Sequence, residues 1–392
     1  LRLLIKAYKV ILIQTLIIFH LPRRLFFVNI IFRVLEKSAL PEPDADALAV
    51  SRELQTLIHA EIAKGGGWIS FARYMEMALY APGLGYYSAG SRKIGAAGDF
   101  ITAPELSPLF GRTLARQLAE LLAQGVHDII ELGAGSGALA AVVLEELAAL
   151  DQLPQRYRIL EVSADLRERQ QQRLRTRLPQ YIDRVEWLER LPDHLNAVVI
   201  GNEVLDALPV HRIRSNQSRV EELGVTAGAQ GYAWTTRPAS AAVAAAAAQL
   251  SLPDDYETEI NLVAPALVSD LASRLDHGAL LFIDYGFPAR EFFHPQRNRG
   301  TLMCHYRHHA HDDPFLWPGL QDITAHVDFS AVAQAGAALD LLGYSNQAQY
   351  LINGGITGLL AEIPASDVAF YAPLAAQAQQ LLSPAEMGEL FK

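Results

Sequence analysis

The sequence is poor in cysteine, in basic residues and in long apolar runs, and each shortage excludes a class of protein. Its one cysteine among 392 residues, Cys304, excludes an internal disulfide framework and a cysteine-ligated zinc site. We interpret Cys304 as a small hydrophobic residue of a strand, in a protein of a reducing compartment. Lysine and arginine number 33 against 43 acidic residues, for a net charge of −10. That charge argues against a nucleic-acid binder and suits a basic substrate.

Residues 1–40 differ in composition from the rest of the chain, because they are rich in leucine, isoleucine and phenylalanine and carry no acid before Glu36. The apolar run 10–21 is about a dozen residues, short of the roughly twenty that a transmembrane helix needs, so no stable membrane insertion is expected. Three interpretations are open: a targeting or membrane segment, an interfacial amphipathic helix pair, or upstream sequence joined wrongly to the true start. The abrupt change to an alanine-rich sequence favours the third.

A helical lid is predicted for residues 41–125, and a larger α/β core for residues 126–392. In the lid region, helices are expected over 45–64 and 70–79, with a glycine break at 65–67 between them. The loop 98–105 is expected to cap a further helix that ends at Leu122. The core begins near Val126.

Strands of the core are predicted near Ile129, Ile159 and Val185, and over 197–200 and 279–284. Between the last two, the runs 210–214, 219–225 and 231–236 alternate polar and apolar residues, which predicts an antiparallel meander inserted at about 210–240. The run 241–248 is expected to be a solvated helix or linker. Towards the C-terminus, we expect a helix over 329–342, a strand over 348–351 and a closing helical end.

A glycine turn follows the first core strand and opens the next helix. The turn contains Gly133, Gly135 and Gly137, and glycines let the backbone turn tightly and approach a ligand. This pattern predicts a nucleotide-type cofactor cradle, but it also fits the dinucleotide fingerprint, whose pyrophosphate would lie over the helix N-terminus. The turn alone leaves the cofactor open.

Two acids favour S-adenosylmethionine over a dinucleotide. Glu131 lies at the end of the first strand, where a carboxylate suits a cationic ammonium and sulfonium but would repel a pyrophosphate. Glu161 ends the next strand, where an acid accepts the ribose hydroxyls of either cofactor. The first acid therefore separates the two cofactors.

The strand over 197–200 delivers Asn202, Glu203 and Asp206 to its carboxyl end, where open α/β sheets bind ligands. The two acids are three residues apart, so a helical turn would place them on one face. Two carboxylates on one face are costly without a cation between them, and a guanidinium is a planar cation that both can hold. The alternative is a helix N-terminus, where the helix dipole favours acids.

A histidine cluster near the C-terminal third could suggest a metal. It contains His305, His308, His309 and His311, followed by Asp312 and Asp313. The cluster lacks the i, i+4 spacing of ligands on a helix and does not draw on separate elements. We therefore predict a solvated or substrate-facing loop and no metal.

Several of these segments together resemble the MidA-type methyltransferases, the bacterial and mitochondrial relatives of a complex I assembly factor that methylates a protein arginine. The similarity runs from about Trp68 to the C-terminus and rests on 98–107, the glycine turn with Glu131, 202–210, 284–286 and 311–314. It implies a Rossmann-like class I fold with seven strands, S-adenosylmethionine as cofactor, and symmetric dimethylation of an arginine on a respiratory complex I subunit.

The resemblance also implies roles for individual residues. Glu131, Gly133, Gly135 and Gly137 would hold the methionine end of the cofactor, and Glu161 the ribose. Asn202 and Glu203 would line the boundary between cofactor and acceptor. Asp206 and, in the lid loop, Glu105 would lie on the acceptor side, so the predicted catalytic residues are Asp206, Glu203 and Glu105.

Two other functions remain open from the sequence. One is an assembly chaperone that binds S-adenosylmethionine without turnover. The other is an NAD(P)-dependent oxidoreductase, which Glu131 and the acid-rich strand end oppose. We expect a protein partner with a target arginine, no nucleic acid, and a cytoplasmic location, with the mitochondrial matrix as the alternative.

Overall fold

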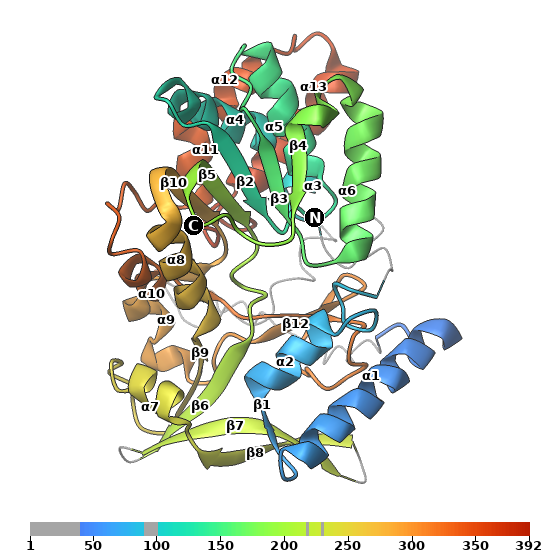
Figure 1. Cartoon of the computed structure of the whole chain (residues 1–392), viewed down its shortest axis with the longest axis vertical. Coiled ribbons are helices and arrows are strands. Elements are labelled where there is room, and N and C mark those ends of the chain that lie inside the picture. Colours follow the sequence, from blue (N-terminus) through green and yellow to red (C-terminus); the bar gives the residue numbers. More distant parts are fainter. Residues whose placement is uncertain (1–39, 90–100, 217–218, 229–230) are drawn as a thin grey trace, which may run out of the picture. The chain divides into compact units, whose positions relative to one another are not determined.

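A parallel sheet forms the centre of the computed structural model, which describes residues 40–89, 101–216, 219–228 and 231–392 (Figure 1). Its strands lie side by side in the order β10-β5-β2-β3-β4, and every neighbouring pair is parallel. Their bounds are β2 (Asp128–Leu132), β3 (Tyr157–Leu160), β4 (Val185–Leu188), β5 (Leu195–Asn202) and β10 (Leu275–Ile283). The α/β class is confirmed, but the described residues place five strands in this sheet where the resemblance implied seven.

The order of the strands changes direction between β2 and β5. From β2 the chain adds β3 and β4 on one side, and then returns to add β5 and β10 on the other. At such a point the loops that follow the two central strands run apart and leave a crevice at the carboxyl edge. Glu131 lies in β2 and Asn202 ends β5, so both are carried to this crevice.

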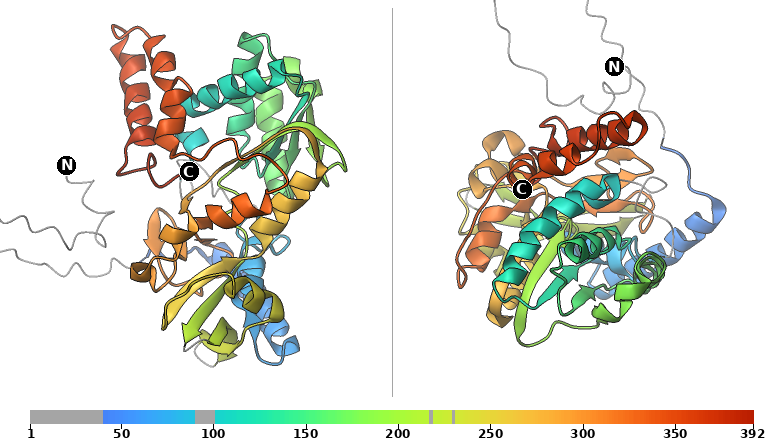
Figure 2. Two further views of the ribbon diagram at one scale, coloured as in Figure 1. Left: turned by 90° about the vertical axis from the view of Figure 1, so that its left-hand side faces the viewer. Right: turned by 90° about the horizontal axis from the view of Figure 1, so that it is seen from above.

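Helices cover both faces of the parallel sheet. Alternate residues of β5 point to opposite sides of the sheet, and those on each side pack into a hydrophobic core. Val198 and Ile200 pack into one hydrophobic core, whereas Val199 packs into another with Leu271 of α8 (Val263–Arg274). The helices of the first core are α4 (Pro108–Ala123), α5 (Ala138–Ala149), α6 (Ala164–Arg177), α11 (Gln347–Asn353), α12 (Ile356–Ala361) and α13 (Val368–Leu382). Figure 2 shows the last three of these beside α4.

A second sheet is antiparallel and contains the predicted meander, β6 (Val210–Asn216), β7 (Arg219–Gly228) and β8 (Gly231–Pro238). Two strands that the sequence did not predict extend it: β1 (Ile69–Ser70) pairs with β7, and β9 (Tyr256–Asn261) pairs with β6. Helices α1 (Ala45–Lys64), α2 (Phe71–Tyr80) and α7 (Ala241–Ala247) accompany this sheet. The meander is therefore one part of a second lobe, and the N-terminal helices are another part (Figure 1).

The remaining elements are short and lie mainly between β10 and α11 in the sequence. They are α3 (Ala103–Leu106), η1 (Pro179–Arg184), β11 (Gly286–Phe287), α9 (Ala289–Phe292), η2 (Pro295–Arg297), β12 (Met303–Tyr306), β13 (His309–His311), β14 (Asp322–Thr324), β15 (Val327–Asp328) and α10 (Phe329–Ala335). Strands β13, β12 and β14 form a small antiparallel sheet. Its Cys304 and Ile323 pack into the hydrophobic core of the second lobe.

Two predicted elements of the C-terminal third are wrong. Residues 348–351 lie in helix α11, because the side chain of Asn346 caps that helix by accepting from the N–H of Gln349 at 2.8 Å. The overlooked signal was the asparagine itself, a residue type favoured at the N-cap of a helix. The helix predicted over 329–342 ends at Ala335, with Gly336 as its C-cap.

Some predictions concern residues outside the described ranges. The N-terminal extension falls there, except for Leu40, and so do Gly98, Asp99 and Phe100 of the lid loop. Among the described residues, no helix has both the length and the apolar character needed to cross a membrane. Residues 40–392 form one compact unit, and the boundaries predicted within it stay predictions.

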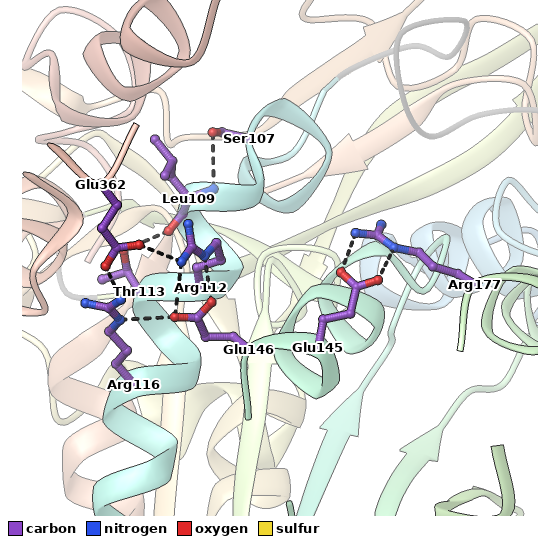
Figure 3. Close-up of polar contacts among 9 residues, drawn as sticks. All are labelled: Ser107, Leu109, Arg112, Thr113, Arg116, Glu145, Glu146, Arg177 and Glu362. Carbon is purple, nitrogen blue, oxygen red and sulfur yellow. Dashed lines mark hydrogen bonds and ion pairs between the residues drawn. The ribbon is translucent and has the colours of Figure 1, made fainter. Parts of the chain in front are cut away.

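A cluster of ion pairs joins the C-terminal helices to α4 and α5 (Figure 3). Glu146 of α5 accepts from Arg112 Nε at 2.6 Å and from Arg116 Nε at 3.1 Å, and its side chain is 8% exposed. The same two arginines donate to Glu362, which caps α12. The nearly buried carboxylate of Glu146 accepts hydrogen bonds from two guanidinium groups. This cluster is therefore expected to stabilise the fold more than a surface pair does.

Replacing Glu146 by alanine is expected to lower the free energy of unfolding by about 3 kcal/mol, since two partly buried arginines lose their shared partner. The matched control is Glu145→Ala, which removes an exposed bidentate pair with Arg177 and should cost less than about 1 kcal/mol. Urea unfolding measures both. Equal losses in the two variants would show that the Glu146 cluster contributes no more than a surface pair.

Candidate functional site

The glycine turn after β2 adopts a backbone that few residues other than glycine tolerate. The φ angles of Gly133, Gly135 and Gly137 are 58°, 52° and 79°, all in the left-handed region. The turn is held at its start, where the N–H of Gly133 donates to the carbonyl of Leu160, and α5 begins directly after Gly137. The structure thus confirms a tight glycine turn at the N-terminus of α5, and its role as a cofactor cradle stays a prediction.

Both strand-end acids lie against this cradle. Glu131 is 3% exposed, accepts from the hydroxyl of Tyr157 at 2.7 Å, and has its pKa raised to about 7 by burial. Glu161 accepts from the N–H of Ser163 at 3.0 Å and from Gln170 Nε2 at 2.9 Å. Because Gln170 Nε2 also donates to the carbonyl of Gly135 at 2.9 Å, one side chain connects the second acid to the glycine turn.

The segment after β5 is a tight turn rather than a helix, and Asp284 holds it. Oδ2 of Asp284 accepts from the backbone N–H groups of Val204, Leu205 and Asp206 at 3.1, 2.8 and 3.4 Å. Asp284 is fully buried at the end of β10. The turn brings Glu203 and Asp206 close together, which the sequence analysis expected of a helical turn. Here the buried carboxylate of Asp284, directly after the neighbouring strand β10, holds the turn instead.

Of the two acids of this turn, Glu203 and Asp206, Glu203 has the pKa that its surroundings raise further. Burial first, and then the negative charge of Asp206, raise the pKa of Glu203 to about 8, although hydrogen bonds from Asn202 and from the N–H of Ala103 oppose the shift. Glu203 also has a φ of 52°, an uncommon value for a residue with a side chain. Strain of this kind is typical of functional sites.

Asp206 is 4% exposed, and burial raises its pKa to about 6 while a hydrogen bond from the Tyr285 hydroxyl opposes the shift. Its Oδ1 is buried with no hydrogen-bond partner among the described residues, and the same holds for Oδ1 of Asn202. Buried polar atoms are normally paired, so these two oxygens indicate a place for a ligand with hydrogen-bond donors.

A cavity of about 1130 Å³ joins these groups, and every predicted site residue except Gly137 lines it. Gly137 instead supplies the left-handed N-cap of α5, where a Cβ would lie 3.4 Å from Gln170. The cavity also has walls that the sequence did not assign. Tyr80 and Tyr87 come from the second lobe, Asp322 and Thr324 from the small sheet, and Tyr285 and His326 from the segments after β10 and after β14.

Glu105 lies against the glycine turn. Its Oε1 contacts Arg173 Nη1 at 3.1 Å and is hydrogen bonded to the hydroxyl of Ser136. Arg173 also donates to that hydroxyl at 2.8 Å, so the three groups form one cluster beside the cradle. The role predicted for Glu105 on the acceptor side stays a prediction.

Carboxyl groups predominate over cationic side chains in the cavity wall, although burial raises the pKa of Glu131 and Glu203. Among the described residues, the lining includes seven carboxyl side chains, those of Glu76, Glu105, Glu131, Glu161, Glu203, Asp206 and Asp322, and one arginine, Arg73. Arg73 is already paired with Glu61 and Glu76. Such a wall attracts cations, as the sulfonium, ammonium and guanidinium groups are, and opposes a pyrophosphate.

The histidine cluster lies on β12 and β13 and the turn between them. His305 lines the cavity, while His309 Nδ1 is hydrogen bonded to the carbonyl of Arg307 at 2.7 Å and His311 Nδ1 accepts from the N–H of Asp313 at 3.3 Å. Over the described residues, no group of three or more His, Cys, Asp or Glu side chains is placed to hold a metal ion.

The raised pKa of Glu203 predicts a pH dependence of stability. The folded protein keeps this proton up to about pH 8, whereas the unfolded chain releases it near the ordinary pKa of 4.5. Stability that is fully present below pH 4.5 is therefore lost as the pH rises through about 8. We expect Glu203→Gln to flatten the decline of the unfolding temperature over this range, as measured by scanning fluorimetry without ligand.

The control for this measurement is Glu168→Gln, which changes an exposed carboxyl of α6. This variant should keep the profile of the parent protein. A decline as steep in Glu203→Gln as in the parent would contradict the assigned shift.

Comparison with known proteins agrees with this site. A family model for S-adenosyl-L-methionine-dependent methyltransferases matches residues 109–345. "Protein arginine methyltransferase NDUFAF7, mitochondrial" of Danio rerio is 30% identical over 357 residues, covering 83% of this chain and 82% of that protein. The homologue of that name in Drosophila melanogaster is 29% identical over 324 residues, covering 74% and 72%.

A solved structure is more similar still. A protein from Burkholderia thailandensis, crystallised with S-adenosyl-homocysteine bound, is 50% identical and superposes with a TM-score of 0.87. The superposition covers 90% of this chain and 94% of that one. A native crystal structure of a protein from the same organism gives 50% identity and a TM-score of 0.84.

Proposed function

This chain belongs to the family of S-adenosylmethionine-dependent methyltransferases, and we propose that its methyl acceptor is an arginine side chain of a protein. Methyl transfer from S-adenosylmethionine is the activity of the family, which sets aside the oxidoreductase alternative. The observation that carries the proposed acceptor is the pair of carboxyl groups of the half-buried Glu203 and the buried Asp206, in a carboxyl-rich cavity beside the cofactor cradle. The curated relatives, named as protein arginine methyltransferases, support the same acceptor.

The residues present fit the cofactor. The cradle of Gly133 and Gly135 leaves room for a ligand, and Glu131 suits the cationic methionine end. We assign Glu161 to the ribose hydroxyls and the unpaired Oδ1 of Asn202 to the boundary with the acceptor. When bound, S-adenosylmethionine supplies a methyl carbon already activated by the sulfonium, so the chain needs to align the acceptor nitrogen and exclude water.

Glu203 and Asp206 are assigned to the acceptor guanidinium. Their carboxyl groups would fix its plane and draw its positive charge away from the nitrogen that attacks the methyl carbon. In the transfer, a carbon–nitrogen bond would form while the carbon–sulfur bond breaks with its electron pair left on sulfur, and the proton lost by the nitrogen would pass to solvent. Asp206, with a pKa of about 6, is the more ionised of the two at neutral pH and supplies the negative charge.

The protein target and the compartment are narrower proposals. A subunit of respiratory complex I follows from the family resemblance, and a cytoplasmic location from the composition. The curated relatives are named mitochondrial, whereas the similar crystal structures are of bacterial origin, so the mitochondrial matrix is kept as the alternative location.

Labelled methyl transfer tests the proposed function. The purified protein is incubated with S-adenosylmethionine carrying a labelled methyl group and a lysate of a strain that lacks this gene, and the labelled acceptor is identified by mass spectrometry. We expect label on arginine of one protein. Label on another residue type would overturn the acceptor, and cofactor binding without any labelled protein would favour the assembly chaperone.

A further inference from the structure

Strand β14 places two polar side chains in the cavity that the sequence did not assign. Asp322 and Thr324 are two residues apart, so they share one face of the strand. Each is 2% exposed and lines the cavity, while Ile323 between them packs into the hydrophobic core of the second lobe. The alternation shows that Asp322 is directed to the site by the strand itself and not by a mobile loop.

Backbone and tyrosine contacts fix β14 against the turn that carries Asp206. The N–H of Ala325, directly after the strand, donates to the carbonyl of Asp206 at 3.0 Å. The hydroxyl of Tyr285 is hydrogen bonded to both Asp206 and Thr324. The small sheet and the β5 turn therefore form one wall of the cavity.

Two stacked tyrosines hold Asp322 at that wall. The hydroxyl of Tyr87 donates to Oδ1 of Asp322 at 3.0 Å, and its ring stacks on Tyr80 with centroids 5.5 Å apart. Tyr80 in turn donates to the carbonyl of Ala207, next to Asp206, at 3.0 Å. Asp322 thus has an orientation fixed by packed aromatic rings, as a binding residue requires.

The three carboxyl groups also interact through their charge. After burial and the charge of Asp206, the charge of Asp322 adds to the raised pKa of Glu203. A cation among these groups would relieve their mutual repulsion. A guanidinium offers five N–H donors around a plane and can reach three carboxylates, whereas an ammonium is a compact point charge.

We propose that Asp322 is a third carboxylate of the acceptor site and binds the guanidinium together with Glu203 and Asp206. The inference rests on the proposed function and adds to it a recognition group from the small sheet. The small sheet and the second lobe then shape substrate choice together, because the sheet supplies Asp322 and the second lobe supplies the stacked Tyr80 and Tyr87, the latter hydrogen bonded to Asp322.

The test titrates the protein, saturated with S-adenosylhomocysteine, with N-acetyl-arginine amide and with the corresponding lysine amide by calorimetry. Asp322→Asn keeps the shape and an acceptor for Tyr87 but removes the charge. Tyr87→Phe removes the hydrogen bond and keeps the charge. Glu168→Gln changes an exposed carboxyl group of α6 outside the cavity lining and is the control.

We expect Asp322→Asn to weaken the arginine probe at least about tenfold, with unchanged affinity for S-adenosylhomocysteine. Tyr87→Phe should weaken it only a few-fold, and Glu168→Gln should leave it unchanged. Equal arginine affinity in the parent and in Asp322→Asn would overturn the role of Asp322 alone. A parent protein that does not prefer the arginine probe to the lysine probe would overturn the proposed acceptor as well.

Discussion

Replacing Gly135 by valine is expected to weaken the binding of S-adenosylhomocysteine about a hundredfold, or roughly 3 kcal/mol. Gly135 lines the cavity and has a φ of 52°, where a β-branched residue is strained by about 1–3 kcal/mol. A valine there either leaves the left-handed region, and distorts the cradle, or keeps it and directs a branched side chain at the ligand. Both outcomes remove the close approach of backbone to cofactor. Calorimetry with the purified protein measures the loss.

A matched variant separates this effect from general destabilisation. Gly355 caps α12 with a φ of 91°, and a Cβ there would meet no atom within 4 Å. Gly355→Val therefore introduces comparable backbone strain outside the cavity lining. It should lower the unfolding temperature and leave the affinity for S-adenosylhomocysteine intact. Retained affinity in Gly355→Val with loss in Gly135→Val supports the cradle, whereas equal affinities would remove Gly135 from it.

The cofactor side of the site could be predicted from the sequence because each of its parts is local. A buried parallel strand is an apolar run, and the residue that follows it must lie at the carboxyl edge of the sheet. Glu131 and Glu161 could therefore be placed on neighbouring strands from chain order alone, and the structure pairs β2 with β3. The glycines of the turn likewise predict its left-handed backbone.

The acceptor side could be predicted only in part. Glu203 and Asp206 were found because they follow β5 directly, but the group that positions them, Asp284, lies 78 residues from Asp206. Tyr87 and Asp322 are separated by 235 residues and meet through packing between the second lobe and the small sheet. The spacing of polar and apolar residues along the sequence cannot predict such a contact. The segment 284–286 could have indicated the position of Asp284, because the family resemblance had included this segment without assigning it a role.

The strand wrongly predicted over 348–351 also shows that the sequence does not reveal tertiary packing. A run of only four residues fits a strand or a helix equally well, and its length alone cannot decide. The capping side chain of Asn346 and the packing of Leu351 into the core with α4 and α13 decide for a helix. Local capping is readable from sequence, but the burial that stabilises so short a helix is not.

Replacing Asp206 by asparagine is expected to lower methyl transfer about a hundredfold, or roughly 3 kcal/mol of transition-state stabilisation, while affinity for S-adenosylhomocysteine is kept. With a pKa of about 6, Asp206 is ionised at neutral pH, whereas Glu203, at about 8, still holds its proton. The variant therefore removes the charge that the guanidinium requires, yet preserves an oxygen to accept from Tyr285. Transfer of labelled methyl to the lysate of the deletion strain measures the rate.

Two comparisons make this result decisive. Asp193→Asn, which changes an exposed carboxyl paired with Arg274, should transfer methyl groups at the parent rate. In the parent protein the rate should rise as the pH increases through about 6, because ionised Asp206 is the form that binds the cation, and Asp206→Asn should lose that rise. A pure cofactor-binding chaperone would show no rate to lose. Unchanged transfer in Asp206→Asn would remove this residue from the acceptor site and leave the arginine proposal dependent on the similarity to its relatives.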